Sequence, residues 1–252
     1  MPPPERPLIV IPAHNEEETI REVVTRTLQY ADVSVTDDGS RDRTPAILAE
    51  IQDECAKNKH AHTLHVITHD RATHIPRGLQ DGLRRGVEQN YDWLITMDAG
   101  LSHNPDALPE FFAAPPEYDV VIGSRQSADN VPLYRRLISR AAARVVNYSL
   151  SSSFLNLRGP GLRDCTSGFR RYSRRAAELI AETELESRAF DFHMEALALA
   201  YRAGMRVTEI PIHYVFSNSS FNSRVLKQGM RFGLHLIATK GRRAPRTTTA
   251  RA

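Results

Sequence analysis

The chain has 252 residues, of which 41% are hydrophobic and 25% are charged, and its formal net charge is +3. This length suits a single α/β domain with a sizeable core, and the small positive charge argues against a nucleic acid partner while suiting phosphorylated ligands. The chain has only two cysteines, and they do not form a CxxC spacing, which argues against a disulfide framework and a zinc site. No apolar run reaches about 18 residues, which argues against a membrane span.

The first half of the chain alternates strand and helix patterns. Short apolar runs typical of strands buried on both faces lie at residues 7–13, 33–40, 64–69, 94–97 and 119–125. Helical spacing of apolar residues lies between them, at 15–29, 43–57 and 77–90. The repeated β-α-β order predicts an α/β fold with a mostly parallel sheet and helices on both faces.

The second half is less regular. Its patterns predict a helix with a basic first turn at 135–155, a loop entering a helix at 163–180, a helix at 192–204, a strand at 207–216 and a basic amphipathic helix at 223–243. The tail at 242–252 is rich in Arg, Thr and Ala without apolar periodicity and is predicted to be disordered. No linker divides the chain, so residues 1–241 are predicted to form one domain.

Polar residues follow the strands at the edge where ligands bind in open α/β sheets. Asp38 ends the second strand, and its carboxylate could accept hydrogen bonds from a base or ribose, although a solvated turn with a helix cap fits the pattern as well. Asp98 follows the fourth strand and suits Mg²⁺ or Mn²⁺, although a lone acid there is more often a cap. Arg125 offers a fork for phosphate.

Seven segments carry a resemblance to a known family. They are "VIPAHNEEETI", "TDDGSRDRT", "MDAGLSHNPDALPEF", "YDVVIGSR", "RRLISRAA", "RDCTSGFRRYSR" and "EIPIHYVF", which run from Val10 to Phe216. In order and spacing they resemble the inverting glycosyltransferases of family 2, and more closely the catalytic domain of dolichyl- or polyprenyl-phosphate mannose synthases. The resemblance implies the Rossmann-like GT-A fold, with a nucleotide-binding half at 7–125 and an acceptor and sugar half at 126–241.

The resemblance also implies roles for individual residues. The loop that holds the nucleotide is matched by Pro12, His14, Asn15 and Glu16, and the acid that meets the base and ribose by Asp38. Asp98 matches the family's first metal-binding acid. The region that binds the diphosphate and the acceptor phosphate is matched by Arg125, Arg136 and Ser139. Glu195 matches an acid near the donor. The loop lining the sugar pocket is matched by Asp164, Ser167 and Gly168. The implied cofactor is Mn²⁺ or Mg²⁺.

Two departures from the family pattern concern the site. Gly100 stands where the family carries a second metal-binding aspartate, and the loop at 69–80 lacks the usual "KxGLG". Asp98 could be joined at the metal by His213, by His103, or by the diphosphate and water alone. His213 lies on an apolar strand, where a histidine packed in the core fits better than a metal ligand.

Three functions remain open on these residues. The first is a metal-dependent transferase that uses a nucleotide-diphosphate sugar, GDP-mannose or a related GDP-sugar, with a lipid-phosphate or small-molecule acceptor. The second is a pyranose–furanose mutase, which would be flavin-independent because no G-x-G-x-x-G fingerprint is present. The third is a nucleotide-sugar binder without activity.

The segment at 223–243 also carries two interpretations. It could rest on an anionic membrane surface, or pack on the catalytic domain with its basic face in solvent. The sequence therefore predicts a cytoplasmic protein that is at most peripheral to the inner face of the membrane. It leaves the oligomeric state open.

Overall fold

In the computed structural model, seven strands form one sheet; the model describes residues 5–241 apart from 130–131, 152, 154, 157, 190 and 216–222. The strand order is β3-β2-β1-β4-β6-β5-β7. Only β6 runs antiparallel to its neighbours within the described sheet. The strands are β1 (Pro7–Ala13), β2 (Asp32–Asp37), β3 (Leu64–Thr68), β4 (Trp93–Thr96), β5 (Val120–Asp129), β6 (Arg170–Ser173) and β7 (Val207–Val215). The predicted mixed, mostly parallel sheet is confirmed.

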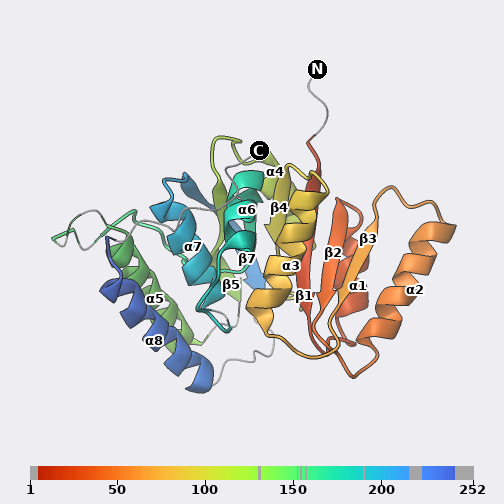
Figure 1. Ribbon diagram of the computed structural model, residues 1–252, viewed down its shortest axis with the longest axis horizontal. Helices are drawn as coiled ribbons and strands as arrows, with labels where there is room; N and C mark the ends of the chain where they lie inside the picture. Colours follow the sequence, from red (N-terminus) through yellow and green to blue (C-terminus); the bar gives the residue numbers. More distant parts are fainter. Residues whose placement is uncertain are drawn as a thin grey trace.

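Helices cover both faces of the sheet. They are α1 (Ile20–Thr27), α2 (Thr44–Lys57), α3 (Ile75–Glu88), α4 (Leu108–Ala113), α5 (Leu133–Leu150), α6 (Arg174–Glu182), α7 (Phe192–Arg202) and α8 (Ser223–Ala238). Along β1, Leu8 and Val10 enter one core while Ile9 and Ile11 enter the other, as the two-residue period of a strand requires. Figure 1 shows α3, α6 and α7 over one face, with α5 and α8 side by side at one end of the molecule.

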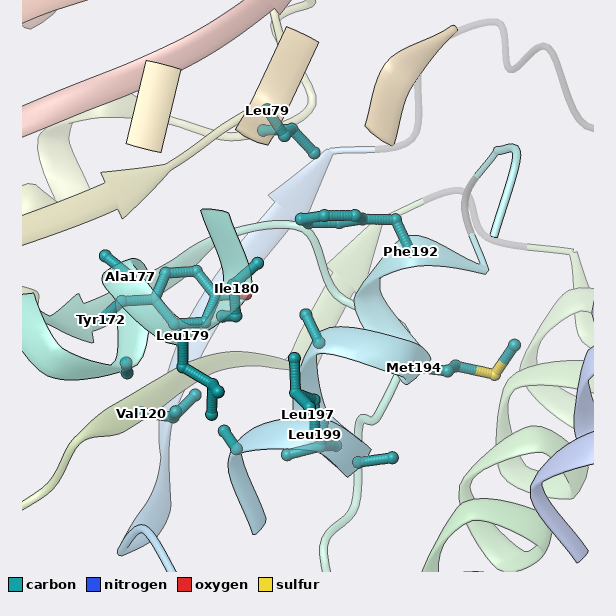
Figure 2. Close-up of a cluster of buried hydrophobic side chains, with 14 of the residues drawn as sticks. Leu79, Val120, Tyr172, Ala177, Leu179, Ile180, Phe192, Met194, Leu197 and Leu199 are labelled. Carbon is teal, nitrogen blue, oxygen red and sulfur yellow. The ribbon is translucent and has the colours of Figure 1, made fainter. Parts of the chain in front are cut away.

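The core under α3, α6 and α7 fixes the elements that carry the site. Figure 2 shows Leu79 of α3, Tyr172 of β6, Ile180 of α6 and Leu197 of α7 converging, and all four are fully or almost fully buried. Burial of one such side chain contributes roughly 1.5–3 kcal/mol. The loops that leave these elements at the carboxyl edge of the sheet therefore start from a rigid frame.

Strand β6 was not predicted, because its sequence does not have a strand pattern. Arg170 and Arg171 are both buried in the middle of the sheet. The guanidinium of Arg171 donates hydrogen bonds to carbonyl oxygens around the end of α4, those of Phe111, Ala114 and Pro115. A charged side chain can be buried when its donors are satisfied in this way. From the sequence, residues 163–180 are predicted as a loop entering a helix, because these hydrogen bonds to distant carbonyls leave no local pattern.

Other boundaries differ at the ends of helices. The helix predicted at 15–29 begins only at Ile20, and the one predicted at 223–243 ends at Ala238. Strands from both predicted halves of the domain belong to the same sheet. The predicted disordered tail at 242–252 lies outside the described residues. Within the described part of the chain, no helix is long and apolar enough to cross a membrane.

Candidate active site

The loops that follow the strands border one large cleft of about 2010 Å³. Pockets for one small molecule usually measure about 300–1000 Å³, so this cleft has room for two substrates. Eleven of the candidate site residues from the sequence line it: Pro12, His14, Glu16, Asp38, Asp98, His103, Arg125, Arg136, Ser139, Asp164 and Gly168. Four do not: Asn15, Ser167, Glu195 and His213.

At one end of the cleft, the loop after β1 is tied to the loop after β2. The backbone N–H of Asn15 donates to Ser40 Oγ (2.9 Å), and Asn15 Oδ1 accepts from the N–H of Arg41 (2.8 Å). The N–H of Glu16 donates to Thr44 Oγ1 (2.8 Å). Asn15 also has a positive φ of 55°, which a right-handed helix does not allow, so the predicted helix starts later. Asn15 holds the loop in shape and lies beside the cleft without lining it.

The Asp38 carboxylate is largely used inside the protein. It is buried and accepts hydrogen bonds from Thr73 N and Oγ1 (2.8 and 2.7 Å), His69 Nδ1 (2.8 Å) and His74 N (2.9 Å). Burial alone would raise the pKa of Asp38, but these hydrogen bonds outweigh it and lower the pKa. Its carbonyl oxygen accepts from His14 Nδ1 (2.8 Å). Asp38 therefore holds the loop after β3 and the ring of His14 at this end of the cleft.

Asp98 projects into the middle of the cleft from the end of β4. Its side chain is 41% exposed, and its backbone N–H donates to Nδ1 of the buried His103 (3.1 Å). That nitrogen is thus occupied as an acceptor and not available to a metal. Burial raises the pKa of the nearby Glu16, and the charge of Asp98 raises it further. A cation in this part of the cleft would relieve the repulsion between the two carboxylates.

His193 of α7 faces Asp98 across Gly168. A Cβ atom built on Gly168 would stand 2.9 Å from His193 Nε2 and 3.2 Å from Asp98 Oδ1, so both atoms border the space that the glycine leaves open. His193 is buried, and its Nδ1 has no hydrogen-bond partner among the described residues. Burial lowers its pKa well below the ordinary value, and the charge of Arg170 adds to this. A neutral imidazole is the form that binds a metal ion.

Sequence reasoning missed His193 and chose Glu195 in the same helix. Residues two apart on a helix point to different sides, so only one of the two can face the cleft. The carboxylate of Glu195 accepts from the N–H groups of Glu186 (3.0 Å) and Ser187 (2.8 Å), and Glu195 does not line the cleft. The run "FHMEALALA" carries no pattern that separates the two residues; in the structure, Glu195 is the one residue of 192–200 that is not buried.

His213 lies away from the cleft. It is exposed, whereas Tyr214, its neighbour on β7, lines the cleft, as expected from the alternation of side chains along a strand. The interpretation of His213 as a core histidine is wrong, because the side chain is exposed. The structure does not bring His213 to Asp98.

Arg125 is already paired with an acid. Its Nε and Nη2 donate to Asp164 Oδ2 (2.7 Å) and Oδ1 (2.8 Å), and Nη2 also donates to Thr166 Oγ1 (2.6 Å). Burial alone would raise the pKa of Asp164, but the charge and hydrogen bonds of Arg125 lower it to about 2. The pair joins β5 to the loop before β6, and leaves only part of the guanidinium for a phosphate.

The loop at 164–168 is held to α7 by Arg170. Its guanidinium donates to the carbonyl oxygens of Ser167 (2.7 Å), Cys165 (2.7 Å) and His193 (2.5 Å). The hydroxyl of Thr96 donates to the carbonyl of Gly168 (2.8 Å). Ser167 is fully buried inside this arrangement and does not reach the cleft. One buried arginine thus fixes the backbone on both sides of the gap at Gly168.

The far end of the cleft has a different character. It continues along α5 and α8, where the exposed Arg136 and Arg140 stand near apolar residues that include Met230, Leu234 and Ile237. Met230 and Leu234 are 61% and 67% exposed, although α8 itself packs through the buried Phe232 and Leu236. The packed interpretation of this helix is confirmed, but its exposed face is apolar as well as basic.

Comparison with known proteins places the chain in a family. The model of Glycosyl transferase family 2 matches residues 8–180. The chain belongs to this family. It is therefore a glycosyltransferase, as the seven segments implied, and the mutase interpretation has no support in the match.

Relatives and solved structures agree with this assignment. The chain is 32% identical over 217 residues to the undecaprenyl-phosphate mannosyltransferase of Micrococcus luteus, an alignment that covers 83% of this chain and 84% of that protein. Glucosyl-3-phosphoglycerate synthase from Mycobacterium tuberculosis, solved with Mn²⁺, UDP and phosphoglyceric acid, superposes with a TM-score of 0.66 at 16% identity, over 97% of this chain and 81% of that one. A mannosyltransferase from Pyrobaculum calidifontis, solved with GDP-Man and Mn²⁺, superposes with a TM-score of 0.61 at 16% identity. That superposition covers 95% of this chain and 66% of the other. The GT-A fold is confirmed.

Proposed function

We propose that the protein transfers a sugar from a nucleoside-diphosphate sugar to a lipid phosphate. The observation that carries this proposal is the continuity of the cleft. One end is built from the loops after β1, β2 and β3, and the other runs between arginines and exposed apolar side chains of α5 and α8. A phosphate joined to a hydrocarbon chain matches the second end, because the two parts of that ligand need the two kinds of surface.

A small phosphorylated acceptor is the competing possibility. The solved synthase from M. tuberculosis holds phosphoglyceric acid, whereas the mannosyltransferase of M. luteus is named for undecaprenyl phosphate. A small polar acceptor would gain nothing from Met230 and Leu234, which lie exposed beside the groove. The apolar surface therefore favours the lipid.

For the donor we propose GDP-mannose or a related GDP-sugar. The name of the M. luteus relative supports mannose, and the structure from P. calidifontis was solved with GDP-Man. The synthase from M. tuberculosis holds UDP. The base is therefore the part of the donor that most needs a direct experiment.

The residues of the cleft suit a hard divalent cation. Among the described residues, no group of three or more His, Cys, Asp or Glu side chains could hold a metal ion by itself. Mn²⁺ and Mg²⁺ are commonly held by one or two protein groups together with substrate phosphates and water. Asp98 and His193 border one space and would be those two groups. When bound, such an ion neutralises the charge that grows on the leaving nucleoside diphosphate.

The acceptor supplies its own nucleophile in this reaction. A phosphate monoester is largely ionised at neutral pH, since its second pKa is near 6, so its oxygen can attack C1 of the sugar without a general base. The C1–O bond to the diphosphate breaks as the new bond forms. Arg136 and Arg140 would hold the acceptor phosphate, while Arg125 and Asp164 fix the wall between the two substrates. The occupation of Glu195 by backbone N–H groups agrees with a reaction that needs no carboxylate base.

Product analysis across a panel tests the proposal. The purified chain would be incubated with Mn²⁺, one of several GDP- and UDP-sugars, and either a polyprenyl phosphate or phosphoglyceric acid, and the products identified by mass spectrometry. We expect a glycosyl phospholipid, with GDP-mannose or a related GDP-sugar as the best donor. Sugar transfer to phosphoglyceric acid alone would contradict the acceptor, and a UDP-sugar as the best donor would contradict the donor.

A further inference from the structure

One residue at the nucleotide end of the cleft has a backbone conformation that side chains rarely adopt. His74, directly before α3, has φ 81° and ψ 154°. This region of φ/ψ space is almost restricted to glycine, and any other residue there lowers the stability of the fold. Such strain persists only where the surroundings impose it.

Hydrogen bonds impose it from one side. The backbone N–H of His74 donates to Asp38 Oδ2 (2.9 Å), and Thr73 donates twice to Asp38 Oδ1. The ring of His69 bridges Asp38 Oδ1 (2.8 Å) and Asp81 Oδ2 (3.1 Å), which links the start of this loop to α3. The loop is therefore tied at both ends to the same carboxylate.

Close packing imposes the strain from the other side. A Cβ atom on Gly39 would stand only 2.7 Å from the backbone N of Ala72, so the turn after β2 and the loop after β3 touch through their main chains. Gly39 has φ +68° and can make this approach without strain. Together these contacts hold the loop that carries His74 against the turn after β2.

Nothing within the described structure uses the imidazole of His74. The side chain is exposed and lines the cleft. It does not cap α3, and no hydrogen bond or ion pair joins it to the residues that the structure describes. A glycine would adopt this backbone conformation without strain, so the fold itself does not require a side chain at this position.

The chemistry of this end of the cleft indicates the ligand. Its lining includes no arginine or lysine, whereas Arg125, Arg136 and Arg140 line the cleft beyond it. The residues that line this end are Pro12, Ala13, His14, Glu16, Glu18, Thr19, Asp38, Ala72, His74 and Ile75. An uncharged planar group suits the first end and phosphates suit the second. An imidazole can stack on a planar base and offers one hydrogen-bond donor and one acceptor. We infer that His74 contacts the nucleobase of the donor and determines which base is accepted.

The inference rests on the proposed function, since it takes the donor to be a nucleotide. It is tested by His74→Gly, for which two measurements should move in opposite directions. Relief of strain should raise the melting temperature by about 2–4 °C. Loss of the ring should weaken the binding of the preferred nucleotide about tenfold, measured by calorimetry with GDP, UDP and ADP in the presence of Mn²⁺. The preference among the three should shrink by a similar factor.

Lys59→Gly is the matched control. Lys59 also has a positive φ, of 48°, but is exposed and outside the cleft, so its replacement should leave nucleotide binding unchanged. A His74→Gly variant with wild-type affinity and base preference would overturn the inference, as would a lower melting temperature or a wild-type protein that binds the three nucleotides equally. A wild-type protein that binds none of them would instead refute the donor site itself.

Discussion

The substitution Gly168→Ala tests the pairing of Asp98 and His193 at a metal. The added methyl carbon would lie 2.9 Å from His193 Nε2 and 3.2 Å from Asp98 Oδ1, whereas relaxed contacts of this kind measure about 3.5–4.0 Å. Both groups must therefore shift by several tenths of an ångström, which exceeds the tolerance of about 0.2 Å in metal–ligand distances. We expect Mn²⁺-dependent nucleotide affinity to fall about 10- to 100-fold, roughly 1.4–2.8 kcal/mol.

Calorimetric titration of GDP and UDP, with and without Mn²⁺, measures this effect. Gly100→Ala is the matched control, because Gly100 also lines the cleft and a Cβ atom there meets nothing within 4 Å. Neither glycine has a positive φ, so backbone strain does not separate the two variants. The reasoning fails if the Gly168 variant keeps the Mn²⁺ dependence of the wild type, or if both variants lose it equally.

Four further outcomes are expected. Gly100→Asp should tighten Mn²⁺ binding measured by calorimetry, since there is open space for the carboxylate. An unchanged affinity would mean that another group already occupies this ligand position of the metal. Because the folded pKa of Asp164 is depressed to about 2, about 2 kcal/mol of stability is present above pH 4 and lost as the pH falls toward 2, and acid unfolding of Asp164→Asn should lack that loss. Arg170→Lys cannot reach three carbonyls and should lower kcat more than it raises KM, while a loss of stability alone would count against a positioning role. The wild type should float with anionic liposomes at low salt, and replacing Met230 and Leu234 by serine should abolish flotation; wild type left in the soluble fraction would refute the membrane interpretation of α8.

The fold was predictable where side-chain patterns are local. The apolar runs of β1, β2, β3, β4, β5 and β7 and the spacing in α2, α3 and α7 follow rules that the sequence displays directly. Strand β6 was not predictable, because Arg170 and Arg171 are buried through hydrogen bonds to carbonyls from distant segments. The late start of α1 was not predictable either, because Asn15 has a positive φ that no local pattern indicates.

The site was predictable at the level of loops and less so at the level of atoms. Motifs placed Asp38 at the cleft, but only the structure reveals that its carboxylate accepts hydrogen bonds from the loop after β3. Likewise Arg125 was expected at a phosphate, and its pairing with Asp164 depends on packing between distant segments. His193 escaped notice because no pattern in α7 tells which side of the helix faces the cleft.

Transfer to a lipid phosphate is the central claim, and one comparison tests it most directly. The full chain would receive labelled GDP-mannose, Mn²⁺ and, in detergent micelles, either a polyprenyl phosphate or the same polyprenol without its phosphate. Asp98→Ala serves as the inactive control. The account predicts that label enters the organic phase only when polyprenyl phosphate, and not the free polyprenol, is the acceptor. This labelling should require Mn²⁺ and should be absent with Asp98→Ala. Equal labelling of the free polyprenol, or labelled sugar isomers formed without any acceptor, would contradict it.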